Sequence, residues 1–192
     1  TLIEVSSLCN ISCKYCAHSQ QQDYFYGNME PQVFQRILEE LHDFSHPIKK
    51  CEMFGFGEPL CNPHFAEMIR KVRQTGMFKS IDFTTNGLLF TPPQTDAVIA
   101  AGVDTIRISL QGLDTETYQR ICGVKIDFDR FVENLRYLYE HKGTCKIRMK
   151  IADIAIKNLV NKEKSLEKIF GEISDSLFIE SIIPMFASVN YN

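Results

Sequence analysis

Apolar positions along the chain follow two alternating periods. Six short segments have the composition of buried strands, and we expect strands at residues 3–6, 51–54, 80–84, 105–110, 146–151 and 177–183. The stretches between them place apolar residues at helical spacing, and we expect helices to begin near residues 31, 62, 91, 128 and 162. The predicted order is therefore a strand followed by a helix, repeated five times, with a closing strand.

Strands that alternate with helices form a parallel sheet with right-handed crossovers. Six strands are fewer than the eight of a complete barrel, which takes about 250 residues, whereas this chain has 192. The pattern leaves an open barrel or a doubly wound sheet. We expect the first, an α/β fold in the form of a partial (βα)6 parallel barrel (an incomplete TIM-like barrel). No linker divides the sequence, so residues 1–192 are expected to form one domain.

In both arrangements, ligands bind beyond the carboxyl ends of the strands. The segments that follow the first four predicted strands are residues 8–16, 55–59, 85–87 and 109–112. These segments carry cysteines, glycines and polar residues that are unusual for plain connections. We expect them to meet at one end of the sheet and to form the functional site.

Composition narrows the class of protein. With 44% hydrophobic and 23% charged residues, a net charge of -3 and no long run of either sign, the chain fits a soluble domain without an evident nucleic-acid footprint. No apolar stretch reaches the roughly 18 residues of a membrane-spanning helix, so we expect no membrane partner. The first residue is Thr1, and little chain follows the last predicted strand, which favours a fragment of a longer protein.

Three of the seven cysteines, Cys9, Cys13 and Cys16, lie within eight residues of one polar loop. An odd, clustered set favours reduced thiols and a cytoplasmic protein. Thiolates suit zinc and iron–sulfur clusters, and three of them can hold a [4Fe-4S] cluster with one iron left open. Structural zinc with His18 as a fourth ligand remains an alternative, as do three free thiols.

The remaining cysteines are scattered, and each is expected to be a core or loop thiol rather than a ligand. They are Cys51, Cys61, Cys122 and Cys145. Of these, Cys61 and Cys122 could lie near the mouth of the barrel.

Two of the other three loops have ordinary interpretations as turns. Glycines in residues 55–59 let a ligand approach the backbone, and Glu58 beside them could hold an ammonium group, but the same stretch suits a tight glycine–proline turn. Asn86 and Gly87 are typical of a turn. Whether these segments bind a ligand or only form turns therefore depends more on their position at the strand ends than on their residue types.

Together the four loops resemble the radical S-adenosylmethionine superfamily. The spacing C-x3-C-x2-C with Tyr15 before the last cysteine, the Gly57-Glu58-Pro59 stretch, Thr85-Asn86-Gly87 and the Ser109-Leu110 end of the fourth strand are similar to its motifs. Phe56 replaces a glycine of the family pattern, and Gln111 replaces an acidic residue. The likeness runs from about residue 3 to residue 184.

The resemblance implies two cofactors and their residues. Cys9, Cys13 and Cys16 would bind three irons of a [4Fe-4S] cluster, and S-adenosylmethionine would chelate the fourth iron. Six further residues would lie at the S-adenosylmethionine site: Tyr15, Gly57, Glu58, Asn86, Ser109 and Arg130. Glu58 would receive the amino group of the cofactor. Arg130 would pair with its carboxylate, although a solvated helix arginine is an equal alternative.

The resemblance also implies a reaction. An electron from a donor such as flavodoxin or ferredoxin would cleave S-adenosylmethionine to methionine and a 5′-deoxyadenosyl radical, which abstracts hydrogen from a substrate. A wide mouth would suit a peptide; a small metabolite, nucleotide or carbohydrate is the alternative. From other classes, a zinc-stabilised binding module and an electron-transfer iron–sulfur protein stay open. The tail, residues 174–185, resembles members that continue into a SPASM or twitch domain with auxiliary clusters.

Overall fold

Five parallel strands form one sheet in the order of the sequence. The computed structural model describes residues 1–20, 26–44 and 46–182. The strands are β1 (Ile48–Met53), β2 (Phe78–Thr85), β3 (Thr105–Leu110), β4 (Lys146–Ala152) and β5 (Ser176–Glu180). Every neighbouring pair is parallel, so the predicted α/β sheet of an incomplete TIM-like barrel is confirmed.

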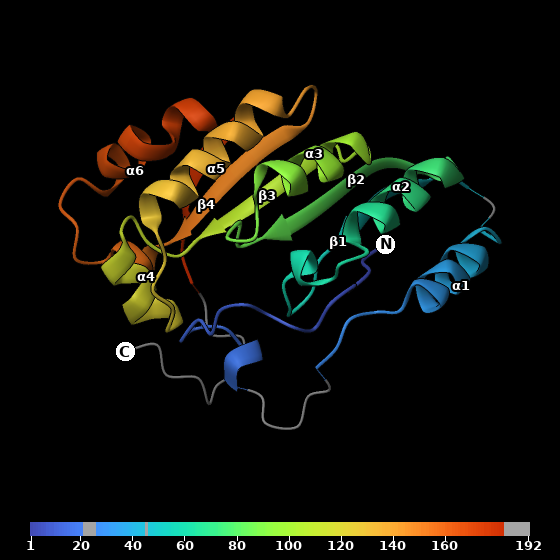
Figure 1. Cartoon of the computed structure of the whole chain (residues 1–192), viewed down its shortest axis with the longest axis horizontal. Helices are drawn as coiled ribbons and strands as arrows, with labels where there is room; N and C mark the ends of the chain where they lie inside the picture. Colours follow the sequence, from blue (N-terminus) through green and yellow to red (C-terminus); the bar gives the residue numbers. More distant parts are fainter. Residues whose placement is uncertain (21–25, 45, 183–192) are drawn as a thin grey trace.

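The connections between the strands are helical. The helices are α1 (Pro31–Leu41), α2 (Phe65–Thr75), α3 (Pro92–Ala100), α4 (Thr115–Cys122), α5 (Phe128–His141) and α6 (Lys162–Phe170). Figure 1 shows α2, α3, α5 and α6 along one face of the sheet, while the N-terminal loop crosses the other side. No helix within the described ranges is long and apolar enough to cross a bilayer.

Strand alternation explains why the two faces of the sheet differ. In β3, Ile106, Ile108 and Leu110 are buried and belong to the hydrophobic core. Arg107 and Ser109, between them, point to the opposite face. The helices therefore cover the apolar face and leave the other face of the sheet for polar groups.

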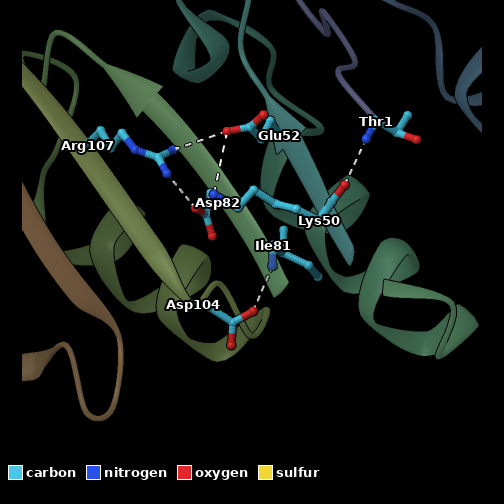
Figure 2. A network of polar contacts seen from close by, with 7 residues as sticks. All are labelled: Thr1, Lys50, Glu52, Ile81, Asp82, Asp104 and Arg107. Carbon is cyan, nitrogen blue, oxygen red and sulfur yellow. Dashed lines mark hydrogen bonds and ion pairs between the residues drawn. The ribbon is translucent and has the colours of Figure 1, made fainter. Parts of the chain in front are cut away.

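The polar face carries an ion network across β1, β2 and β3 (Figure 2). Asp82, whose side chain is only 4% exposed, pairs with Arg107 at 2.6 Å and with Lys50 at 3.1 Å. Glu52 lies within 3.8 Å of both cations. Since a buried carboxylate needs such partners, this network explains how a charged residue is accommodated in the middle of the sheet.

The first expected strand, residues 3–6, is an extended segment with only isolated bridges. Leu2 pairs with Glu52 beside β1, and the Ile3 N–H donates to the Glu52 carbonyl at 2.9 Å. From Val5 onward, the hydrogen bonds turn away from β1, because the Val5 carbonyl accepts from Met29 N–H and from the Asn62 side chain. The segment therefore leaves the sheet after one bridge and carries the cysteine loop across its end.

Two further differences concern the end of the chain and α4. The closing strand ends at Glu180 rather than at residue 183. Residues 183–185, on which part of the SPASM or twitch likeness rests, lie outside the described residues.

No helix was expected at α4, although Asp114 caps its first turn and Gly123 ends it with a φ of 72°. Its eight residues are too few for a visible apolar period.

Candidate functional site

A cavity of about 590 Å³ lies at the carboxyl ends of the strands. Its wall is formed by the cysteine loop, by residues 54–58 after β1, by the end of β2 and by the end of β3. These are the segments that the sequence placed at one edge. Eight of the nine expected site residues line it: Cys9, Cys13, Tyr15, Cys16, Gly57, Glu58, Asn86 and Ser109.

Arg130 is the exception. It is exposed in the first turn of α5, and its backbone N–H donates to the capping side chain of Asp127 at 3.1 Å. It is absent from the wall of this cavity. The structure therefore does not bring Arg130 together with the other expected residues.

The three thiols of the cysteine loop face the cavity with different degrees of burial. Cys13 is buried, whereas Cys9 and Cys16 are partly exposed. Burial raises the pKa of the Cys9 thiol to about 12 and also raises that of Cys16. A hydrogen bond with Cys122, together with burial, raises the pKa of Cys13. Without a cation nearby these groups are neutral thiols, and a bound metal would reverse that preference by stabilising thiolates.

No single-ion metal site is found in the described part of the chain, where no three His, Cys, Asp or Glu side chains converge to hold one ion. The ring of His18, the fourth ligand of the zinc alternative, has its Nε2 2.7 Å from the Ser7 carbonyl oxygen. The three thiols thus share a cavity without enclosing one point.

Hydrogen bonds fix the cysteine loop against neighbouring elements. Asn86 at the end of β2 donates from its side chain to the Asn10 side chain at 2.8 Å. The Tyr15 hydroxyl donates to Oε1 of Gln111 at the end of β3. These contacts hold the loop over the strand ends. Gln111 was missed as a site residue because it departs from the family pattern.

The glycine loop approaches the cysteine loop so closely that only glycine fits at position 57. A Cβ built on Gly57 would lie 2.2 Å from the Ser6 carbonyl oxygen and 2.7 Å from that of Leu8. The Glu58 N–H donates to the Leu8 carbonyl at 2.7 Å. Glu4 accepts from the N–H groups of Phe56 and Gly57. The two loops are therefore joined backbone to backbone.

Glu58 lies in the wall of the cavity and is 2% exposed. Its Oε1 accepts from the Thr85 hydroxyl at 2.7 Å and from Leu60 N–H at 3.1 Å, and its Oε2 accepts from Asn86 N–H at 2.7 Å. Burial raises its pKa, against the opposing effect of these hydrogen bonds. The carboxylate therefore links the loop after β1 to the end of β2.

Lys150 is a second residue that the sequence did not single out. It points from β4 into the cavity wall and pairs with Glu180 of β5 at 2.7 Å. Register places it beside Ser109 of β3. The sequence did carry a signal for Lys150, because side chains alternate along β4. Met149 and Ile151 are buried under the helices, so Lys150 between them points to the other face of the sheet.

An open parallel α/β barrel with three thiols and a glycine loop at its strand ends defines the core of a cofactor-dependent enzyme. The sequence model of the radical SAM superfamily matches residues 3–151. The chain belongs to the radical SAM superfamily, whose members use a [4Fe-4S] cluster and S-adenosylmethionine.

Individual relatives are distant. The chain is 24% identical over 187 residues to the tungsten-containing aldehyde ferredoxin oxidoreductase cofactor-modifying protein of Pyrococcus furiosus, covering 95% of this chain and 51% of that protein. It is 29% identical over 167 residues to the GTP 3′,8-cyclase of Chlorobaculum tepidum, covering 84% and 46%. The chain thus spans about half the length of the curated relatives it matches.

Among solved structures, the fold is similar to that of Streptococcus suis SuiB bound to precursor peptide SuiA. The TM-score is 0.70 at 18% identity, over 100% of this chain and 41% of SuiB. At this identity, the likeness concerns the fold.

Proposed function

We propose that this chain is the catalytic core of a radical S-adenosylmethionine enzyme in which Cys9, Cys13 and Cys16 each bind one iron of a [4Fe-4S] cluster. One observation carries the proposal: the three thiols line the same cavity as the loops after β1, β2 and β3. The donor set fits the cluster, because each thiolate takes its own iron and the sulfurs need not converge on one point.

S-adenosylmethionine would occupy the remaining iron and the cavity beside it. The bound cluster and cofactor supply one-electron cleavage to methionine and a 5′-deoxyadenosyl radical. The protein supplies position and excludes water. Ser109 and the backbone around Gly57 would face the cofactor. Tyr15 would cover the side of the cavity that the cysteine loop forms. Glu58 and Asn86 hold these groups in place, because their hydrogen bonds join the loops. Arg130 is left out of the set, since it lies away from the cavity.

For the substrate we propose a peptide. The fold likeness to SuiB, solved with its precursor peptide, extends over the whole chain and supports this choice. Lys150 lines the cavity, with Glu180 of β5 as its ion-pair partner, and offers a positive charge to a peptide carbonyl or acidic side chain. The similarity to a GTP 3′,8-cyclase keeps a nucleotide as the competing substrate. A cytoplasmic location and reduction by flavodoxin or ferredoxin would suit this chemistry.

Anaerobic reconstitution with iron and sulfide tests the proposal. The parent protein should bind a full cluster and release methionine and 5′-deoxyadenosine from S-adenosylmethionine. Cys9→Ala and Cys16→Ala should each lose cluster and cleavage, because a second iron is then left without a thiolate. Cys145→Ala is the matched control, since Cys145 is a buried thiol just before β4. Full iron content in the Cys9 and Cys16 variants would contradict the ligand assignment.

Deuterium transfer tests the substrate class. A peptide deuterated at the reacting carbon should pass deuterium to 5′-deoxyadenosine, whereas GTP should not. Transfer from deuterated GTP alone would favour the nucleotide.

A further inference from the structure

Cys122 is a buried thiol that the proposed chemistry does not use. It is the last residue of α4 and 0% exposed. Its Sγ lies 3.6 Å from Sγ of Cys13, and either sulfur can act as the donor while both are thiols. Within the described residues, it is the one cysteine outside the cysteine loop that shares a hydrogen bond with another thiol.

The backbone makes this contact a fixed feature. Ser12 N–H donates to the Cys122 carbonyl at 3.1 Å, and Lys14 N–H donates to the Ile121 carbonyl at 3.0 Å. These two hydrogen bonds flank Cys13 on both sides. The end of α4 and the middle of the cysteine loop are therefore held in register independently of the two thiols.

The surroundings strengthen the contact. Cys13 is 8% exposed, and Tyr118, one helical turn before Cys122, is 0% exposed. Little water reaches the pair, and a hydrogen bond is electrostatically stronger in such a site than in water.

We propose that Cys122 is a positioning residue whose S–H donates to the Cys13 sulfur and raises the reduction potential of the cluster. The inference rests on the proposed function, in which Cys13 is an iron ligand. An iron-bound thiolate carries no proton, so it can only accept, and Cys122 becomes the donor. A donor to a ligand sulfur stabilises the charge gained on reduction.

The test compares reduction potentials of reconstituted proteins. Cys122→Ala and Cys122→Val both remove the donor; Ala leaves a small gap, whereas Val fills the site with a slightly larger apolar side chain. Cys122→Ser retains an O–H donor. Cys145→Ala removes a buried thiol away from the site. Iron and sulfide content is measured first, and the potential is then followed by the electron paramagnetic resonance signal of the reduced cluster.

We expect the Ala and Val variants to bind the same iron as the parent but to be harder to reduce. The ratio of reduced to oxidised cluster at a fixed potential should fall roughly threefold to tenfold, where tenfold corresponds to about 59 mV for one electron. The Ser and Cys145→Ala proteins should not show this fall.

Several outcomes would overturn the proposal. Parent-like potentials in both donor-free variants would mean that the Cys13 sulfur turns away from Cys122 in the loaded protein. A fall in the Ser variant as large as in Val would indicate packing rather than a hydrogen bond. Both results leave the proposed function standing, since the cluster is present. A parent protein that binds no iron would overturn both.

Discussion

The Tyr15 hydroxyl donates a hydrogen bond to Oε1 of Gln111, tying the cysteine loop to the end of β3. Nε2 of the same side chain donates to the Ser109 carbonyl at 3.0 Å. A glutamine therefore supplies an acceptor and a donor at once. A carboxylate, which the family resemblance would place here, could accept from Tyr15 but could not donate to Ser109. The departure from the family pattern is thus explained by the contacts of this chain.

A double-mutant cycle with Tyr15→Phe and Gln111→Leu should measure this link. Each single change should lower the free energy of unfolding of the cluster-free protein by about 1–3 kcal/mol, because it leaves a buried partner unsatisfied. The double variant should lose less than the sum of the two. Urea denaturation gives the three differences, and strictly additive losses would show that the two side chains do not depend on one another.

Gly57→Ala tests the close approach of the two loops. The added Cβ would meet the Ser6 carbonyl oxygen, a backbone atom that cannot rotate away. We expect a loss of stability of about 1–3 kcal/mol or more, since overpacking forces the backbone to move. The urea midpoint of the cluster-free protein measures it.

Gly171→Ala is the matched control for this change. Its φ is -57°, and the atoms near its Cβ belong to the flexible Glu167 side chain. The control should be nearly neutral. Equal midpoints for the parent and Gly57→Ala would refute the close approach.

Much of the fold follows from apolar periods, and the exception at residues 3–6 has a long-range cause. β3 was predicted with the correct ends, because the alternation of apolar and polar residues along it is a strong signal, and α6 begins at the expected residue, Lys162. Residues 3–6 have the apolar residues of a strand, but competition for the Val5 carbonyl by Met29 and Asn62 depends on segments far apart in sequence. No local pattern carries that information.

Most of the expected site residues line one cavity, while their binding roles stay a prediction. Motif residues at strand ends reached the cavity because parallel strands all end at one edge of the sheet. Arg130 did not, since a helix position sets which way a side chain faces, and α5 begins outside the cavity. Lys150 was missed because it comes from the middle of a strand whose partner, Glu180, lies 30 residues away. The alternation of β4 assigns Lys150 to the polar face of the sheet, but only the tertiary structure pairs it with Glu180.

Asp175 should make stability depend on pH. Burial opposes its ionisation, but the hydrogen bonds from Ile147 N–H at 2.7 Å and from Lys142 outweigh burial and lower its pKa. A carboxyl with a lowered folded-state pKa stabilises the protein above its unfolded pKa, near 3.9. That contribution is lost as the pH falls through the lower folded value.

Asp175→Asn should therefore be less stable than the parent at neutral pH by about 1 kcal/mol. This difference in unfolding free energy should become smaller below about pH 4. Chemical denaturation across this pH range measures it, with Glu133→Gln, an exposed position in α5, as the control. A gap that stays constant down to pH 2 would remove ionisation as its cause.

Glu58 holds two loops together, so replacing it should lower the stability of the protein as well as remove a charge. Its two oxygens accept from the backbone N–H groups of Leu60 and Asn86, one each. In Glu58→Gln, the amide NH2 must face one of these donors, whichever way the amide is turned. We expect the cluster-free protein to lose about 1–3 kcal/mol, because a buried donor is left without an acceptor.

Thr85→Val separates positioning from direct contact with the amino group of S-adenosylmethionine. Val keeps the shape of Thr85 and the charge of Glu58, but removes the hydroxyl that donates to the carboxylate at 2.7 Å. If Glu58 acts by placing Asn86 and the glycine loop, S-adenosylmethionine should bind more weakly to both variants, and more so to Glu58→Gln. If Glu58 contacts the ammonium directly, only Glu58→Gln should weaken binding, by about tenfold or more. Dissociation constants measured at equal iron content decide between the two, and parent-like binding in both variants would reduce Glu58 to a turn residue.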